Sequence, residues 1–307
     1  MKLHHVIEAQ QFTLPMLGEL FDLAGDMERI LARGGTQDYS NKIMASLFYE
    51  PSTRTRFSFE SAMLRLGGKV LSTERAHEFS SVTMGETLED TIRVVNNYAD
   101  VIVLRHSEVG GAARAAAVSA VPILNAGDGK GGQHPTQALL DLYTIYKEKK
   151  SIEGIKVAMV GNLAEGRTVR SLAYLLGKFE RVKIFFIAPP FLQMKQDILD
   201  YLAEQNVWVT LERDLARVLP EVDVVYITRI EQELLRKEGE ASGKTASSYL
   251  IDEQMMRLLS PNALVMHPLP RLHEITPAVD NDQRAAYFLQ TRNGVLIRMA
   301  LLVSVLG

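Results

Sequence analysis

The 307-residue sequence contains no cysteine, which excludes disulfide bridges and thiolate metal sites and suits a reducing compartment. The sequence also lacks a large excess of charge of either sign, since its formal net charge is -3. No basic stripe dominates any segment, which argues against a nucleic-acid partner. No apolar run approaches the ~20 residues that a membrane span needs, and residues 1–6 lack the apolar core of a signal peptide. These absences predict a soluble, cytoplasmic protein without a membrane partner.

Short apolar, β-branched segments alternate with longer amphipathic ones along nearly the whole chain. This alternation predicts parallel sheets joined by crossover helices, and hence an α/β fold. A chain of this length more naturally forms two domains than one. We expect a boundary at 151–154, which gives domains over residues 1–150 and 151–307, each a parallel sheet flanked by helices. An apolar helix expected at about 283–306 should pack back on the body and return to the first domain.

The expected strands are short and rich in β-branched residues: 42–48, 101–105, 121–125, 155–161, 182–188, 207–211, 222–228 and 263–267. The expected helices are amphipathic: 53–66, 86–98, 112–118 and 135–149. A further helix should start at Leu14, with Thr13 as its N-cap and proline in its first turn. Residues 238–248 are polar and rich in small residues, and they predict a loop.

One segment, Glu50-Pro51-Ser52-Thr53-Arg54-Thr55-Arg56, lies between an expected strand and an expected helix. Ser and Thr should cap this helix, so that unpaired N–H groups and hydroxyls converge at its positive end. The arginines add guanidinium groups that can bind a phosphate through paired hydrogen bonds. An ordinary cap needs one hydroxyl, whereas three hydroxyls and two arginines fall within five residues here. The segment therefore predicts a phosphate-binding loop at a strand end.

Two glycine-rich segments do not match nucleotide-binding motifs. Residues 127–132 lack the spacing of a P-loop, and residues 161–166 lack the middle glycine of a dinucleotide fingerprint. A nucleotide is therefore not indicated. We expect no cofactor and no metal.

Three further motifs lie at expected strand ends: Arg105-His106, Gln133-His134-Pro135-Thr136-Gln137 and His267-Pro268-Leu269-Pro270-Arg271. A single histidine at a helix start is more often a cap or a packed residue than a catalyst, but two His-Pro motifs at such junctions weaken that interpretation. In this order and spacing, Ser-Thr-Arg-Thr-Arg, His-Pro-Thr-Gln and His-Pro-Leu-Pro-Arg resemble the aspartate carbamoyltransferase family, and the similarity runs from about Asn41 to Arg298. Ornithine carbamoyltransferases are less similar, because their counterpart of His-Pro-Leu-Pro normally carries a cysteine.

The resemblance implies that carbamoyl phosphate donates its carbamoyl group to L-aspartate, a step of pyrimidine biosynthesis that needs no cofactor. It implies a phosphate site made of Ser52, Thr53, Arg54, Thr55 and Arg105. It implies that Thr55, Arg105 and His134 surround the carbamoyl oxygen and that Gln137 contacts the carbamoyl nitrogen. It also implies that the backbone carbonyls of Pro268 and Leu269 meet the carbamoyl nitrogen or the incoming amine. It implies that Arg167, Arg229 and Glu231 face the amino-acid substrate. The family forms catalytic trimers, so the resemblance implies a homotrimer and leaves open whether regulatory chains join it.

A few positions depart from the family pattern. Met84 stands where the family has a lysine that crosses the trimer interface into the neighbouring active site. Ser80, at the same expected interface, is retained. Glu231 replaces a glutamine that binds aspartate, and Leu234 replaces an arginine that holds the closed state through Glu50. These departures leave two alternatives open: a carbamoyltransferase with another amine acceptor, or a non-catalytic paralogue that binds carbamoyl phosphate or a partner chain.

Overall fold

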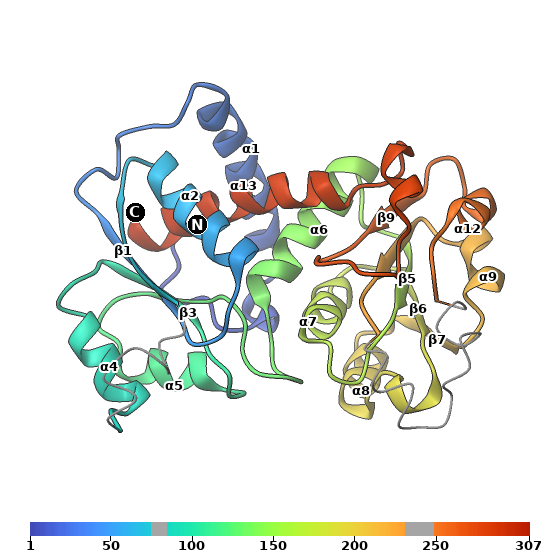
Figure 1. The fold of residues 1–307 in the computed structure, drawn as a ribbon, viewed down its shortest axis with the longest axis horizontal. Helices are drawn as coiled ribbons and strands as arrows, with labels where there is room; N and C mark the ends of the chain where they lie inside the picture. The colour runs from blue at the N-terminus through green and yellow to red at the C-terminus, as the bar shows by residue number, and fades with distance from the viewer. Residues whose placement is uncertain (75–84, 231–248) are drawn as a thin grey trace. The chain divides into compact units, whose positions relative to one another are not determined.

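The computed structural model describes residues 1–74, 85–230 and 249–307 (Figure 1). The chain divides into two compact units: Met1–Tyr143 with Arg292–Gly307, and Thr144–Thr291. Each unit contains one parallel sheet flanked by helices, as the sequence predicts.

The sheet of the first unit has the strand order β2-β1-β3-β4. Its strands are β1 (Ile43–Phe48), β2 (Lys69–Glu74), β3 (Val101–Arg105) and β4 (Ile123–Asn125). All neighbouring pairs are parallel, so the carboxyl ends of the strands meet at one edge of the sheet. Phe48, near this edge, pairs with Glu74 on one side and with Arg105 on the other.

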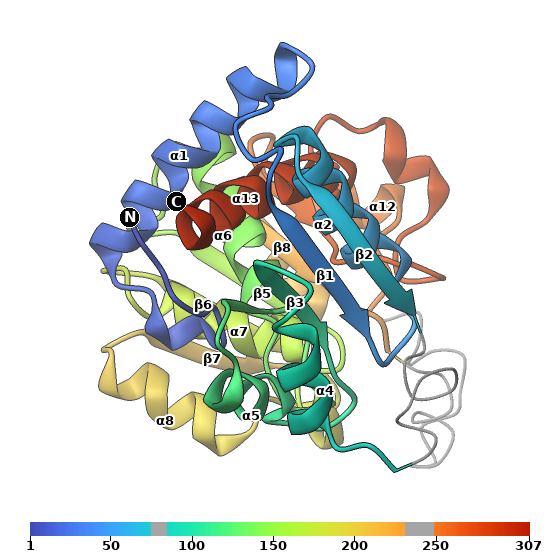
Figure 2. The same cartoon turned by 90° about the vertical axis from the view of Figure 1, so that its left-hand side faces the viewer.

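Helices cover both faces of this sheet: α1 (Leu14–Ala32), α2 (Thr53–Arg65), α4 (Leu88–Val95) and α5 (Gly111–Val118). Successive side chains of a strand point to opposite faces. Ala45 and Leu47 therefore join the apolar cluster that includes residues of α4 and α5. Ser46 points the other way, and its hydroxyl donates to Glu60 of α2 at 3.1 Å. Figures 1 and 2 show α2 on one face and α4 and α5 on the other.

The C-terminal helix α13 (Tyr287–Leu306) packs back on the body, as predicted. The backbone N–H of Leu3 donates to the carbonyl of Ser304 at 2.9 Å, and the guanidinium of Arg298 lies 5.0 Å from the centroid of the Phe59 ring in α2. In the described part of the chain, only α13 is long and apolar enough to cross a membrane. Its most apolar window is 67% buried, which is what the core helix of a soluble protein shows.

The sheet of the second unit is also parallel, with the order β7-β6-β5-β8-β9. Its strands are β5 (Lys156–Val160), β6 (Lys183–Ile187), β7 (Trp208–Glu212), β8 (Val224–Ile227) and β9 (Leu264–Met266). Helix α6 (Pro135–Lys149) leads into this unit, and the helices that follow are α7 (Arg167–Leu176), α8 (Gln196–Glu204), α9 (Leu215–Val218) and α12 (Glu253–Leu258). One face of the sheet buries Val160, Ile187 and Val225 against Met256 of α12.

Strand β2 is not among the strands that the sequence predicts. It is an edge strand whose residues are exposed or half-buried, so it lacks the apolar alternation that marks a strand with one covered face. Two expected helices are shorter than predicted: α4 covers 88–95 within the expected 86–98, and α13 begins at Tyr287.

Candidate active site

Ser52 occupies the N-cap position of α2, in the segment that joins β1 to this helix, but its side chain makes no cap hydrogen bond. Its hydroxyl instead accepts a hydrogen bond from Arg105 Nη1 at 3.3 Å, and its backbone N–H donates to Glu74 at 3.2 Å. The prediction that this serine caps the helix is therefore wrong. Because the hydroxyl lies at the carboxyl edge of the sheet beside a guanidinium, the ordinary-cap interpretation of the loop loses its main support.

Arg105, the last residue of β3, is held at the same edge by contacts from neighbouring strands. Its Nε lies 3.3 Å from a carboxylate oxygen of Glu50, and its Nη1 contacts the Ser52 hydroxyl and, at 3.5 Å, the carbonyl of Ala126. The side chain is 13% exposed. A positive charge is thus fixed, largely out of water, where the ends of β1, β3 and β4 converge.

The two arginines of the predicted phosphate loop have different surroundings. Arg56 forms an ion pair with Glu74 of β2 at 3.3 Å, and its guanidinium lies 5.2 Å from the Phe57 ring centroid. It therefore ties the loop to the edge strand. Arg54 is exposed, and Thr55, the next residue of α2, is buried.

His134 and Gln137 lie where the chain enters α6, after β4. The carbonyl of His134 accepts from the N–H groups of Gln137 and Ala138, at 3.0 and 3.1 Å, and so starts the helix. The side chain of Gln137 donates through Nε2 to Asp141 Oδ1 at 2.8 Å. Because His134 and Gln137 are 3% and 9% exposed, both side chains are largely shielded from water.

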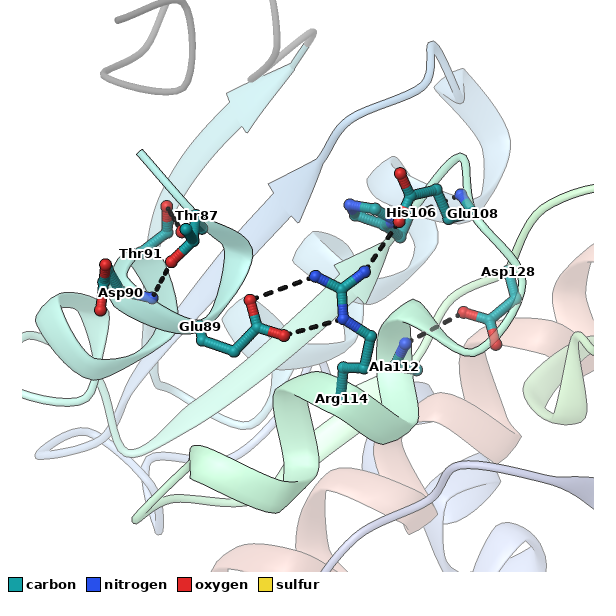
Figure 3. A network of polar contacts seen from close by, with 9 residues as sticks. All are labelled: Thr87, Glu89, Asp90, Thr91, His106, Glu108, Ala112, Arg114 and Asp128. Carbon is teal, nitrogen blue, oxygen red and sulfur yellow. Dashed lines mark hydrogen bonds and ion pairs between the residues drawn. The ribbon is translucent and has the colours of Figure 1, made fainter. Parts of the chain in front are cut away.

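A network of charged side chains braces the loop that follows Arg105 (Figure 3). Arg114 of α5 binds both carboxylate oxygens of Glu89 in α4, at 2.8 and 3.1 Å, and also contacts Glu108 at 2.8 Å. Asp128 accepts from the N–H of Ala112 at 3.2 Å, near the start of α5. The network joins α4, α5 and the segments after β3 and β4.

His106 is a packed residue within this braced loop. Its Nδ1 accepts from the N–H of Glu108 at 3.1 Å, and its ring lies 4.8 Å from that of Tyr49. Burial lowers the pKa of His106, more than the nearby carboxylates raise it. A Cβ on Gly111 would lie 2.6 Å from Nδ1, so the close packing of this ring requires glycine there.

In the second unit, the predicted substrate residues also follow strand ends. Arg167 begins α7 after β5, Arg229 follows β8, and Pro268–Leu269 follow β9. These three strands are adjacent and parallel, so the residues share one edge of the sheet. Thr228, next to the exposed Arg229, anchors its hydroxyl on the carbonyl of Val160 at 3.0 Å.

A buried histidine and a carboxylate hold the loop after β9. His267 accepts at Nδ1 from the N–H of Leu269 at 2.7 Å, so its Nε2 carries the proton and faces Glu274 at 2.9 Å. Glu274 also accepts from the N–H groups of Leu272 and His273, at 3.2 and 3.0 Å. Leu269 has φ 54, a left-handed conformation that is uncommon for a branched residue. The hydrogen bond to His267 helps to hold this strained backbone.

The electrostatics of Glu274 reflect these contacts. Burial by itself raises the pKa of this carboxyl, but the hydrogen bonds from His267 and from backbone N–H groups outweigh it and bring the pKa from 4.5 to about 2. Glu274 is therefore a carboxylate throughout the physiological range.

Sequence reasoning missed three carboxylates that support these segments: Glu74, Asp141 and Glu274. Only Asp141 left a local signal, because it lies four residues after Gln137 on one helix face. The residues predicted at the trimer interface and beside the amino-acid substrate, Ser80, Met84 and Glu231, lie outside the described residues.

Comparisons with known proteins identify the family. The family model for "Aspartate/ornithine carbamoyltransferase, carbamoyl-P binding domain" matches residues 4–147, and the one for "Aspartate/ornithine carbamoyltransferase, Asp/Orn binding domain" matches residues 153–305. Chloroplastic aspartate carbamoyltransferase of Arabidopsis thaliana is 53% identical over 302 residues, which cover 98% of this chain and 77% of the relative. The aspartate carbamoyltransferase catalytic subunit of Methanopyrus kandleri is 48% identical over 303 residues, covering 98% and 97%.

Solved structures indicate the same family. The crystal structure of aspartate transcarbamoylase from Trypanosoma cruzi in complex with carbamoyl phosphate and aspartate superposes with a TM-score of 0.93 at 42% identity, over 100% of this chain and 96% of that one. Both units and nearly every residue are covered by these similarities, so the chain belongs to the aspartate/ornithine carbamoyltransferase family.

Proposed function

We propose that this chain is an enzyme that transfers the carbamoyl group of carbamoyl phosphate to the amino group of L-aspartate, giving N-carbamoyl-L-aspartate and phosphate for pyrimidine biosynthesis. The Arabidopsis and Methanopyrus relatives carry the name of this activity, and the Trypanosoma structure contains carbamoyl phosphate and aspartate. The observation that carries the proposal is the Arg105 guanidinium, held by Glu50 and Ser52 at the carboxyl edge of the first sheet.

The first unit supplies the groups for carbamoyl phosphate. The phosphate is bound by charged and hydroxyl side chains at this edge: Ser52, Thr53, Arg54, Thr55 and Arg105. Negative charge develops on the carbamoyl oxygen when the amine attacks, and Thr55, Arg105 and His134 donate hydrogen bonds to it. One well-placed donor of this kind is worth about 3 kcal/mol of barrier. A C–N bond forms, the C–O bond to phosphate breaks, and the departing phosphate takes the amine proton, so no strong protein base is needed.

The second unit supplies the groups for the amino acid. Arg167 and Arg229 bind the aspartate carboxylates, with Glu231 beside them, and the carbonyls of Pro268 and Leu269 accept hydrogen bonds from an N–H of the substrates. The ordered turn at Leu269, held by His267, supports the last role because it fixes where these carbonyls lie.

The assay is the formation of N-carbamoyl-L-aspartate from carbamoyl phosphate and L-aspartate between pH 6 and pH 9. Arg229→Ala serves as a matched variant that should raise the KM for aspartate and leave the KM for carbamoyl phosphate nearly unchanged. A wild-type protein that yields no carbamoyl-aspartate at any of these pH values contradicts the proposal. Glu231 raises the alternative that the acceptor is another amine. Phosphate release with a panel of amines tests this, because an amine that reacts faster than aspartate would be the better candidate for the substrate.

We further propose that the chain works as a cytoplasmic homotrimer, with Ser80 and Met84 at the subunit interface. Edge strand β2 and the neighbouring α2 support an interface in this region, because they expose the large apolar side chains of Leu71, Phe57 and Leu64, which are 49%, 55% and 60% exposed. Sedimentation of wild-type protein and of a Phe57→Glu, Leu64→Glu variant tests this. A wild-type monomer at micromolar concentration would contradict the trimer.

A further inference from the structure

The buried carboxylate of Asp141 orients the side-chain amide of Gln137. Its Nε2 donates to Asp141 Oδ1 at 2.8 Å, and Asp141 is 0% exposed. The two residues lie one turn apart on the same face of α6. Because an ionised carboxylate only accepts hydrogen bonds, the NH2 end of the amide must face Asp141. The oxygen Oε1 is therefore the end of the amide that faces away from Asp141.

A buried arginine supplies a positive charge near Asp141. Arg298 of α13 belongs to the same unit, is 4% exposed and lies over the Phe59 ring. Burial lowers the pKa of Arg298 to about 10, and the charge of Asp141 opposes this fall. Arg298 therefore stays a cation at neutral pH. Gly294, one turn earlier on α13, makes room for it, since a Cβ there would lie 2.9 Å from Arg298 Nη1.

We propose that Asp141, charge-balanced by Arg298, is a positioning residue that presents the Gln137 oxygen to the transferred group and thereby selects carbamoyl phosphate over acetyl phosphate. The proposal rests on the function proposed above, in which Gln137 meets the carbamoyl nitrogen. A carbamoyl group carries an NH2 donor at the place where an acetyl group carries a methyl. An acceptor held at that place gains a hydrogen bond only from the carbamoyl group.

The test compares two ligands that differ at this one group. The KM for carbamoyl phosphate and the inhibition constant of acetyl phosphate, competing with it, are measured for the wild type and for Asp141→Asn. An asparagine both donates and accepts, so the Gln137 amide is free to turn. The preference for carbamoyl phosphate should fall about 3- to 10-fold, the value of one hydrogen bond. General damage to the site would weaken both ligands alike and leave their ratio unchanged.

Two further variants separate positioning from folding. In a Gln137→Leu background, which removes the acceptor, Asp141→Asn should change the ratio no further. Asp141→Asn leaves Arg298 as a buried cation without its counter-charge, which can destabilise the fold. The double variant Asp141→Asn, Arg298→Met removes both charges, and it should show the same loss of preference.

A folded Asp141 variant, single or double, that retains the wild-type ratio overturns the inference. Failure of the wild type to form carbamoyl-aspartate would count against the proposed function instead. The inference on Asp141 can then still be tested. Calorimetric titration with carbamoyl phosphate and with acetyl phosphate gives the ratio of their affinities without turnover.

Discussion

Replacing Glu274 by glutamine should weaken the second unit by an amount that depends on pH. The carboxylate is 10% exposed and accepts hydrogen bonds from His267 and from the N–H groups of Leu272 and His273. Glutamine is nearly isosteric and keeps one acceptor oxygen, but it removes the charge that these three donors face. The substitution therefore tests the electrostatic contribution with little change in packing.

The shift in the pKa of Glu274 gives the size of its contribution to the free energy of unfolding. A carboxyl whose pKa falls from 4.5 to about 2 on folding contributes about 3 kcal/mol to the free energy of unfolding at neutral pH. Because the pKa is lower in the folded state, this contribution is complete above about pH 4.5 and is lost as the pH falls towards about 2. Since glutamine retains part of the hydrogen bonding, Glu274→Gln should cost about 2 kcal/mol at pH 7 and much less near pH 3.

Urea unfolding followed by far-UV circular dichroism measures this free energy. The single tryptophan, Trp208 of β7, is already 68% exposed in the folded unit, so its emission would change little on unfolding. Glu180→Gln, at an exposed position of the same unit, is the matched control and should change the unfolding free energy by less than about 0.5 kcal/mol. Equal destabilisation by Glu274→Gln at pH 7 and pH 3 would refute the electrostatic account, as would an effect no larger than that of the control.

Other positions give equally direct tests. Arg105→Ala should weaken binding of carbamoyl phosphate about 10- to 100-fold, measured by calorimetry, because a charge-assisted hydrogen bond is lost; unchanged affinity would contradict its place in the site. Gly161→Ala should lower the free energy of unfolding by about 2 kcal/mol or more, measured in urea, because φ is +124 and a Cβ would lie 2.3 Å from the Thr228 hydroxyl; a neutral effect would refute this packing argument. Met84→Lys should raise kcat about tenfold or more, since it supplies the cation that the family resemblance implies at this position; a rate no higher than that of Met84→Gln would refute the role of charge.

Local patterns were sufficient to predict most of the fold. Parallel strands and amphipathic helices differ in period, and the strand-end motifs fall at carboxyl edges because the sheets are parallel throughout. The cap at Thr13 is confirmed, since its hydroxyl accepts from the N–H of Met16 at 3.4 Å. The cap at Ser52 was wrong, because a guanidinium from β3, 53 residues further along the chain, competes for the hydroxyl.

What the sequence did not reveal depends on contacts between distant segments. Strand β2 is defined by its pairing with β1, and its own residues carry no strand periodicity. Glu74, which ends β2, accepts from Ser52 and Arg56 only because that pairing brings it to the loop. The charge of Arg298 near Asp141 likewise requires α13 to return from the end of the chain. No local window contains both partners of such contacts.

The return of α13 also has a consequence for biosynthesis. The first unit is discontinuous: it takes its last helix from Arg292–Gly307, and the whole second unit lies between its two segments. On the ribosome, the second unit therefore has all of its residues before the first unit does, although the first unit begins to emerge earlier. Until α13 arrives, the Phe59 ring of α2 lacks the Arg298 guanidinium that lies over it in the folded unit. A nascent chain held at this stage should be the species that binds chaperones, and the N-terminal half made alone should aggregate.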